Sequence, residues 1–201
     1  VVVGAAREGV GRLDRLPASG DEARAVGDVV RVREDATEAA LVAALASAER
    51  WRAVHLACHG LFEVARPEFS ALALTPDAAD DGFLTALEVA RLTVAADLVV
   101  LSACSTARGR VVRGEGALGL ARAFLRAGAP RVLCASWKVD DAATAALMTR
   151  FYAAYRPRDG TAAKPAAAAL REAQAAVAAD PRWAHPAFWA AWVLWGRADG
   201  P

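Results

Sequence analysis

The chain has 201 residues, of which 56% are apolar and 23% are charged, so it is long enough for one globular domain with a full hydrophobic core. Its 24 basic and 23 acidic residues leave a formal charge of +1, which provides no bulk attraction to nucleic acid or to an anionic membrane. The longest aromatic-rich apolar run covers residues 187–195 and is about half of the roughly 20 residues that a membrane-spanning helix needs. We therefore expect a single domain with no nucleic-acid partner and no membrane segment.

The first residue and the cysteines indicate whether the chain is part of a longer protein and in which compartment we expect it. The chain begins with valine rather than methionine and shows no signal peptide, so we expect residues 1–201 to be one domain of a longer protein. The three cysteines, Cys58, Cys104 and Cys134, are odd in number, and none has the C-x-x-C spacing of a zinc site. We expect reduced thiols in the cytoplasm, with no metal and no cofactor.

Hydrophobic patterning in the first half of the chain predicts strands and helices in alternation. Apolar residues at helical spacing predict a helix over residues 36–51, with Asp35 or Thr37 as its amino-terminal cap. A polar, proline-containing insert follows, in which we expect a loop or hairpin around residues 71–74. A short helix is predicted over residues 85–92. Strands are predicted over residues 1–3, 29–32, 53–58 and 98–103.

The second half continues the same alternation. A helix over residues 116–126 is closed by Gly128 and Pro130, which are typical of a helix end. Two further amphipathic, alanine-rich helices and two strands are predicted. The helices cover residues 141–155 and 162–179, and the strands cover residues 131–136 and 188–195. This pattern predicts an α/β fold with a mainly parallel sheet and helices on both of its faces.

Ligand sites in such sheets lie beyond the carboxyl ends of the strands, where two residues are of interest. His59 follows one apolar strand and Cys104 follows another. A thiol needs a low pKa or an adjacent base to act as a nucleophile at neutral pH, and an imidazole supplies that base. The backbone N–H groups of Gly60 and Cys104 are candidates for binding an oxyanion.

Each of these residues also has a structural interpretation. A lone cysteine at a strand end is more often a buried core thiol, and we assign Cys58 and Cys134 to the core. The pairing of His59 with Cys104, about 45 residues apart, favours catalysis for these two. His55 is expected to be a buried histidine with a hydrogen-bond partner.

Asp140 has two interpretations that the sequence leaves open. It directly precedes a predicted helix and could cap that helix. It could instead lie beside the Cys-His edge and receive a basic side chain of a substrate. The four tryptophans near the carboxyl terminus are expected mainly in the core, although at least one must meet a helix or a partner. They are Trp183, Trp189, Trp192 and Trp195.

Five motifs, in this order and spacing, resemble those of CHAT domains, which are caspase-like members of the cysteine peptidase clan that includes separases and gingipains. The motifs are His55-Leu56-Ala57-Cys58-His59-Gly60, Leu101-Ser102-Ala103-Cys104-Ser105-Thr106, Gly114-Glu115-Gly116, Ala127-Gly128-Ala129 and Ser136-Trp137-Lys138-Val139-Asp140-Asp141. The resemblance extends over essentially the whole chain and implies a caspase-like fold.

The resemblance also implies roles for individual residues. His59 is similar to the catalytic histidine and Cys104 to the nucleophile, with Gly60 and Cys104 as oxyanion-hole donors. Asp140 corresponds to an acidic residue that lines the substrate pocket in relatives specific for basic residues. Ser102 and Trp137 are expected beside it, although metacaspases have an acid at the position of Ser102. CHAT domains are often fused to tetratricopeptide repeats, and no repeat of about 34 residues is present in this chain.

We interpret the chain as a cysteine endopeptidase of bacterial-type signalling that cleaves a protein or peptide and is controlled by an activating partner or a fused repeat domain. The long polar segments at residues 66–81 and 108–113 are candidates for that control. One alternative is a catalytically silent interaction module with the same fold. A weaker alternative is a dinucleotide-binding domain, because Gly114, Gly116 and Gly119 satisfy G-x-G-x-x-G.

Overall fold

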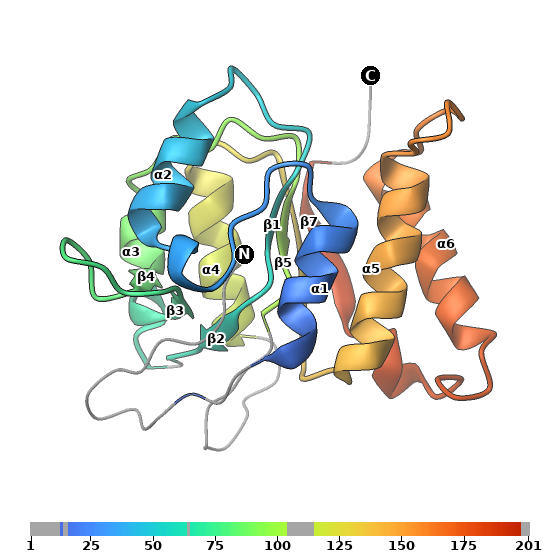
Figure 1. Ribbon diagram of the computed structural model, residues 1–201. Coiled ribbons are helices and arrows are strands. Elements are labelled where there is room, and N and C mark those ends of the chain that lie inside the picture. Colours follow the sequence, from blue (N-terminus) through green and yellow to red (C-terminus); the bar gives the residue numbers. More distant parts are fainter. Residues whose placement is uncertain (1–12, 14–15, 64, 104–114, 198–201) are drawn as a thin grey trace.

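The computed structural model describes residues 13, 16–63, 65–103 and 115–197. In this part of the chain a central sheet is sandwiched between two layers of helices (Figure 1). One layer contains α2 (Glu38–Ala46), α3 (Ala86–Val89) and α4 (Glu115–Arg126). The other contains α1 (Pro17–Val26), α5 (Asp141–Tyr155) and α6 (Ala166–Ala178).

The central sheet has the strand order β1-β5-β6-β7. Its strands are β1 (Val54–Leu56), β5 (Val99–Leu101), β6 (Arg131–Ala135) and β7 (Trp192–Gly196). The first three run parallel, and β7 is antiparallel to β6. The predicted α/β fold with a mainly parallel sheet covered on both faces is therefore confirmed.

Side-chain alternation along β5 explains why this sheet needs both helix layers. Val99 and Leu101 pack in the cluster with α2, α3 and α4, whereas Val100 packs with α5 and α6. All three residues are at most 3% exposed. Because successive strand residues point to opposite faces, an entirely apolar strand requires cover on both sides. Each such aliphatic side chain contributes roughly 1.5–3 kcal/mol on burial.

The chain between β1 and β5 forms a second, smaller sheet of three antiparallel strands, at the lower left of the view in Figure 1. It consists of β2 (His59–Leu61), β3 (Ala71–Ala73) and β4 (Phe83–Thr85). The hairpin predicted around residues 71–74 is thus one strand of a sheet. A 3-10 helix, η2 (Pro67–Phe69), precedes β3 within the polar insert.

Several predicted boundaries are corrected by the structure. Residues 29–32 form no strand, and Val29 is 50% exposed. The helix predicted from residue 36 begins at Glu38 and ends at Ala46, and Thr37 caps it by accepting a hydrogen bond from the Ala40 N–H at 3.1 Å. The predicted strand at residues 1–3 lies outside the described residues.

The carboxyl-terminal strand is shorter than predicted. Residues 186–188 form a 3-10 helix, η3 (Pro186–Phe188), and β7 starts only at Trp192. Trp192 is buried beneath α6, whereas Trp195 is 37% exposed. Trp183 and Trp189 pack partly buried against the same cluster as Trp192. The prediction of a mainly core role is confirmed for three of the four tryptophans.

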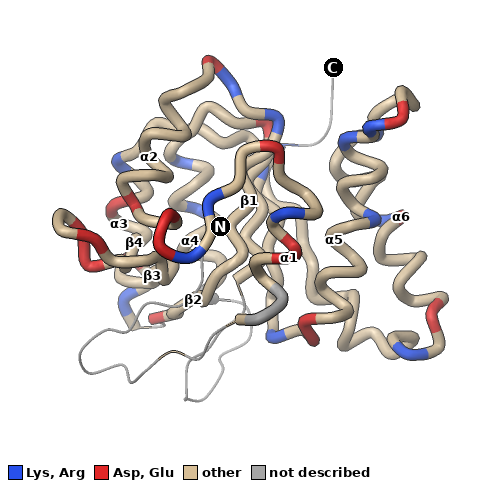
Figure 2. Tube along the Cα trace, viewed as in Figure 1, with Lys and Arg blue, Asp and Glu red and all other residues tan. Residues whose placement is uncertain are grey.

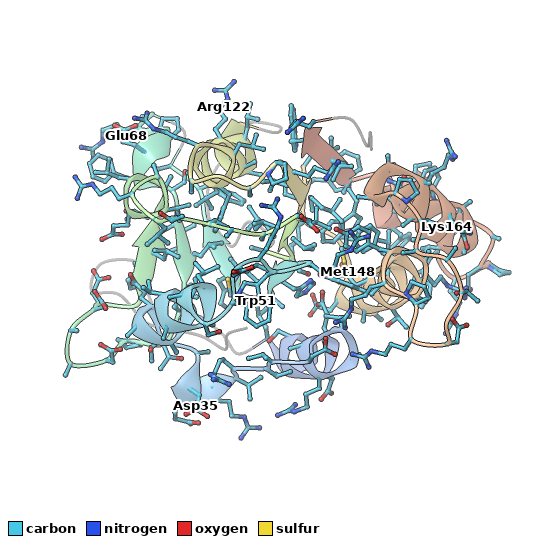
Figure 3. All side chains as sticks on the ribbon, turned by 90° about the horizontal axis from the view of Figure 1, so that it is seen from above. Asp35, Trp51, Glu68, Arg122, Met148 and Lys164 are labelled. Atoms are coloured by element: carbon cyan, nitrogen blue, oxygen red, sulfur yellow. The ribbon has the colours of Figure 1, made fainter. Side chains whose placement is uncertain are left out.

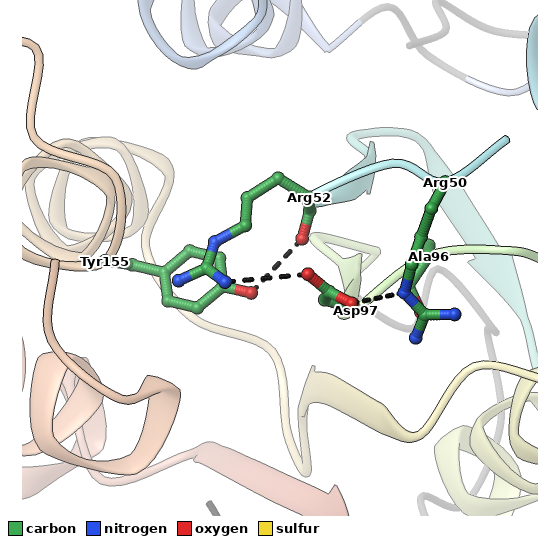
Figure 4. Close-up of polar contacts among 5 residues, drawn as sticks. All are labelled: Arg50, Arg52, Ala96, Asp97 and Tyr155. Atoms are coloured by element: carbon green, nitrogen blue, oxygen red, sulfur yellow. Dashed lines mark hydrogen bonds and ion pairs between the residues drawn. The ribbon is translucent and has the colours of Figure 1, made fainter. Parts of the chain in front are cut away.

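The start of β1 is anchored by charged and polar contacts (Figure 4). Asp97 accepts hydrogen bonds from Arg50 and Arg52. The Tyr155 hydroxyl donates to the Arg52 carbonyl at 3.1 Å, and the Arg52 guanidinium lies 4.5 Å from the centre of the Tyr155 ring. These contacts join β1 to α5 and to the segment before β5.

Basic and acidic residues are both spread over the described elements, and acidic residues gather in the loop between β3 and β4 (Figure 2). This arrangement agrees with the formal charge of +1. Among the described helices, none is long and apolar enough to span a membrane.

Candidate active site

The two candidate catalytic residues come, in the sequence, after the carboxyl ends of two neighbouring parallel strands, β1 and β5. The register of β1 and β5 sets Leu56 opposite Leu101. His59 is the third residue after Leu56, and Cys104 is the third residue after Leu101. The histidine and the cysteine therefore each follow, by three residues, one member of the same pair of facing strand residues. Cys104 itself lies outside the described residues.

Gly60 lies directly against the end of the cysteine strand. A Cβ atom built on Gly60 would lie 3.5 Å from the Cβ atom of Ala103, the residue before Cys104. The same Cβ would lie 2.8 Å from Cζ of Phe62, so a larger residue at position 60 would have to displace that ring. The structure thus brings the His59-Gly60 segment to the residue that precedes the thiol. The oxyanion-hole role of Gly60 and Cys104 stays a prediction.

His59 is positioned by the change from one sheet to the other. The predicted strand 53–58 ends early, at Leu56, and Ala57 and Cys58 link it to β2. His59 begins β2, pairs with Ala73 of β3 and is 3% exposed. His55 and His59 therefore belong to different sheets, although they would share a face of one uninterrupted strand.

The predicted substrate-binding residues lie on or next to this edge. Ser102 follows β5 and is buried, with 9% exposure. Trp137 follows β6, is 41% exposed, and is held by a hydrogen bond from its indole N–H to the Ala187 carbonyl at 3.0 Å. Because β6 neighbours β5 in parallel, Trp137 leaves the sheet at the same edge as the cysteine segment. Contact of either residue with a substrate remains a prediction.

Asp140 caps α5. Its carboxylate accepts a hydrogen bond from the Ala143 N–H at 2.9 Å, and its carbonyl accepts one from the Thr144 N–H. The capping interpretation is therefore confirmed, while the proposed contact with a basic substrate residue is untested. The Asp140 side chain is exposed, so capping leaves part of the carboxylate open to solvent.

Cys58 and Cys134 are core thiols, as predicted. They are free cysteines with 0% and 3% exposure. Burial raises the pKa of each thiol to about 12, because an apolar environment disfavours the thiolate. Neither residue is suited to act as a nucleophile at neutral pH.

His55 forms a closed polar network between three elements. Its Nε2 lies 3.0 Å from Oε1 of Glu22 on α1, and its Nδ1 lies 3.2 Å from the hydroxyl of Tyr152 on α5. A carboxylate accepts hydrogen bonds, so Nε2 carries the proton and Nδ1 accepts from the Tyr152 hydroxyl. Burial raises the pKa of Tyr152, which keeps the phenol protonated. The predicted structural role of His55 is confirmed.

The sequence pointed to neither Glu22 nor α1. The segment has a signal that could have located the helix, because Pro17 is its first residue and proline favours that position. The contact of Glu22 with His55 has no local signal, since 33 residues separate them.

Packing accounts for one glycine of the G-x-G-x-x-G pattern. A Cβ on Gly119 would lie 3.0 Å from the carbonyl oxygen of Pro67, where η2 approaches α4. In a dinucleotide-binding unit the first glycine follows the strand almost at once, whereas here β5 ends at Leu101 and α4 begins at Glu115. Gly114 lies outside the described residues. Within the described part of the chain, no group of three or more His, Cys, Asp or Glu side chains is placed to hold a metal ion.

The family model described as "CHAT domain" matches residues 2–197. The chain belongs to the CHAT family. Its α/β architecture, with a mainly parallel four-stranded sheet, is consistent with the caspase-like fold of CHAT domains. The matched range covers nearly the entire chain and contains all five motifs named above.

Two curated relatives are longer proteins. The CHAT chain is 39% identical to Tetratricopeptide repeat protein 28 of Mus musculus and 36% identical to the protein of the same name in Homo sapiens, each over 113 residues. Those matches cover 56% of this chain but only 4% of either relative. The similarity therefore concerns one small part of those proteins.

Proposed function

We propose that this CHAT domain is a cysteine endopeptidase in which His59 and Cys104 form the catalytic dyad. The observation that supports the proposal best is the register of β1 and β5, which gives the histidine and the cysteine equivalent positions at one sheet edge. The close approach of Gly60 to Ala103 is a second, independent indication that the two segments meet.

The proposed reaction uses groups of this chain alone. His59 accepts the proton of the Cys104 thiol, and the thiolate attacks the carbonyl carbon of a peptide bond. The backbone N–H groups of Gly60 and Cys104 donate hydrogen bonds to the resulting oxyanion. The imidazolium returns the proton to the leaving amine as the C–N bond breaks. Water, activated by His59, then hydrolyses the thioester and restores the thiol.

The principal alternative is a catalytically silent CHAT module that binds a partner. The burial of His59, at 3% exposure, favours a domain that does not act on substrate in this conformation. We reconcile the two by proposing that an activating partner or a fused repeat domain, as the name of the relatives suggests, rearranges the site. The segments at residues 66–81 and 108–113 are the candidates for that control, and residues 108–113 lie outside the described residues. The reduced thiols expected of this chain fit a cytoplasmic location.

The decisive experiment compares peptide-library cleavage by the parent protein and its Cys104→Ala variant, each alone and with a tetratricopeptide-repeat domain added as a candidate activator. We expect cleavage by the parent and its complete loss in the variant, with an unchanged circular dichroism spectrum. Cys134→Ala is the matched control, since it removes a buried thiol with a raised pKa and should keep activity. Equal cleavage by the parent and Cys104→Ala would eliminate the dyad. No cleavage by any form, with or without the added repeat domain, would favour the silent module.

A further inference from the structure

Four carboxylates gather on the side of the molecule away from α5 and α6 (Figure 2). Asp77, Asp80 and Asp81 lie in the loop between β3 and β4, and Glu88 lies in α3. All four act electrostatically on one group, the carboxyl of Glu38, so they lie close together in space. We call these four residues the acidic cluster. None of them belongs to the candidate active site.

The acidic cluster is not neutralised by the described part of the chain. The ion pairs there engage other carboxylates, among them Asp28 and Asp97. Arg33 and Arg91 lie on neighbouring segments, and within the described residues neither forms an ion pair with the cluster. Like charges at short range repel one another, so this surface presents a concentrated negative potential.

Glu38, at the start of α2, is a second and separate feature of this surface. It is only 8% exposed, and among the described residues its carboxyl group has no hydrogen bond or ion pair. The charges that act on it most strongly are those of the acidic cluster, so the side chain faces the cluster. A buried carboxylate without a partner is costly, because nothing replaces its lost hydration. The arrangement therefore favours a positive charge supplied by another molecule.

The spacing of the carboxylates distinguishes a metal ion from basic side chains. Ca²⁺ needs several oxygen ligands at about 2.3–2.6 Å, and no group of three or more acidic side chains in the described part of the chain is placed to hold one ion. Several positive charges along an extended segment can instead each meet a different carboxylate. A guanidinium is weakly hydrated and can donate two parallel hydrogen bonds to one carboxylate, which suits the poorly hydrated Glu38.

We propose that Glu38 and the acidic cluster form a docking surface for an arginine-rich segment of a partner protein, with one arginine side chain paired to Glu38. The other arginines pair with the cluster. The loop lies partly in the insert at residues 66–81, which is a candidate for control of the domain. The proposed docking does not depend on catalysis by the chain.

Local hydrogen bonds prepare two carboxylates of the cluster for this role. Asp81 accepts the Phe83 N–H through Oδ1 at 2.9 Å, and Glu88 accepts the Thr85 N–H through Oε2 at 2.8 Å. Each carboxylate is thus fixed by one oxygen, while its other oxygen has no hydrogen bond among the described residues. Fixing these side chains before binding lowers the entropy cost of association.

The 3-10 helix η1 (Arg33–Asp35) extends the same surface. Thr75, at the start of the loop, donates its N–H to the Ala36 carbonyl at 3.0 Å and its hydroxyl to the Arg33 carbonyl at 2.6 Å, which holds η1 beside the loop. Glu34 and Asp35 are exposed there, and Asp35 lies at the periphery of the molecule (Figure 3). A bound segment that continues towards η1 would meet these further carboxylates.

Isothermal titration calorimetry on the whole 201-residue chain tests the proposal, with a capped peptide in which arginine alternates with alanine. A peptide with the neutral isostere citrulline in place of arginine should bind at least about 100-fold more weakly. Glu38→Gln should weaken binding of the arginine peptide at least about tenfold, and Asp80→Asn should weaken it several-fold. Glu49→Gln is the matched control, because it makes the same change in charge at an exposed residue after the other end of α2, and it should bind as the parent does.

Proton release distinguishes a direct contact with Glu38 from general attraction between charges. Burial and the acidic cluster raise the pKa of Glu38 to about 7, so part of the protein carries a proton there at that pH. A guanidinium paired with Glu38 lowers this pKa, and binding near pH 7 should release a proton in the parent but not in Glu38→Gln. Titrations in two buffers of different ionisation enthalpy measure the release. The free energy of unfolding of Glu38→Gln should not fall below that of the parent, so weaker binding does not come from misfolding.

Three results would overturn the proposal. The first is no binding of the arginine peptide to the parent at about 0.15 M salt, or equal binding of the citrulline peptide. The second is equal affinity in the parent, Glu38→Gln and Glu49→Gln, which would reduce the interaction to overall charge. The third comes from CaCl₂ as a separate probe: Ca²⁺ binding that is lost in Glu38→Gln and that the peptide does not displace would assign the surface to a metal ion.

Discussion

His55 and His59 are four residues apart, yet they lie in contrasting environments. Both ring nitrogens of His55 are engaged in a network that joins α1, β1 and α5. His59 starts a strand of the other sheet, where Gly60 meets the end of the cysteine strand. The difference arises from the break after Leu56, which sends the chain from one sheet into the next. His55 is consequently part of a structural network, whereas His59, buried at 3% exposure, lies in the segment that approaches the end of β5.

The largest expected difference between the two histidines is in peptidase activity, measured after each is replaced by alanine. On a substrate from the peptide library, we expect His59→Ala to lower kcat/KM by about 1,000-fold or more, because the general base is lost. His55→Ala should remain within a few-fold of the parent at temperatures where it is folded. Equal losses in both variants would contradict the division of roles.

Stability should respond in the opposite order. His55→Ala leaves Glu22 and Tyr152 buried without their shared partner, and we expect the free energy of unfolding to fall by about 3 kcal/mol in urea denaturation. Glu22→Gln keeps an acceptor for the His55 N–H and should cost less. A loss below about 1 kcal/mol for His55→Ala would show that water replaces the network without penalty.

The comparison extends to two buried carboxyl groups, Glu22 with its histidine partner and Glu38 at the start of α2. Burial, followed by the nearby negative charges, raises the pKa of Glu38 to about 7. Those charges are Glu88, Asp80, Asp81 and Asp77, most of them in the acidic loop between β3 and β4 (Figure 2). Glu38 is 8% exposed, so solvent provides little compensation.

The sign of the resulting pH effect follows from proton binding. Between the ordinary carboxyl pKa of 4.5 and the raised value of about 7, the folded state binds more protons than the unfolded state, so stability decreases as the pH rises through this window. Glu38→Gln removes that penalty and should raise the free energy of unfolding by about 2 kcal/mol at pH 8, with little change at pH 4.5. Urea titrations at the two pH values check this, with exposed Glu34→Gln as control. An equal effect at both pH values would exclude ionisation as its cause.

The smallest expected effect concerns Asp140, where capping and substrate binding can be separated. Asp140→Ala should lower the free energy of unfolding by about 1 kcal/mol through loss of the cap on α5, whereas Asp140→Asn retains a capping acceptor and should cost a few tenths. If the carboxylate also binds basic substrate residues, Asp140→Asn should reduce the preference for them in library cleavage. An unchanged preference would leave Asp140 with its structural role alone.

The predictability of the fold varies with how local its determinants are. The apolar run over residues 98–103 and the Gly128-Pro130 helix end were predictable, because burial on both faces and helix termination are written in a few adjacent residues. Residues 29–32 satisfied the same composition rule and form no strand, since a strand also needs a neighbour to pair with. The three-stranded sheet was largely missed because β3 and β4 lie in or next to the polar, proline-containing insert, whose composition predicts loops.

The candidate site, like the fold, was predictable only where its determinants are local in the sequence. His59, Gly60 and Cys104 were identifiable from their residue types, from their positions after apolar runs and from the CHAT motifs. The sequence alone therefore determined the family, the α/β class and the candidate dyad. Only the tertiary structure decided that Leu56 lies opposite Leu101, that Gly60 approaches Ala103 and that Glu22 pairs with His55. These contacts join residues more than 30 positions apart, and their partners are selected by packing of the whole chain rather than by local propensity.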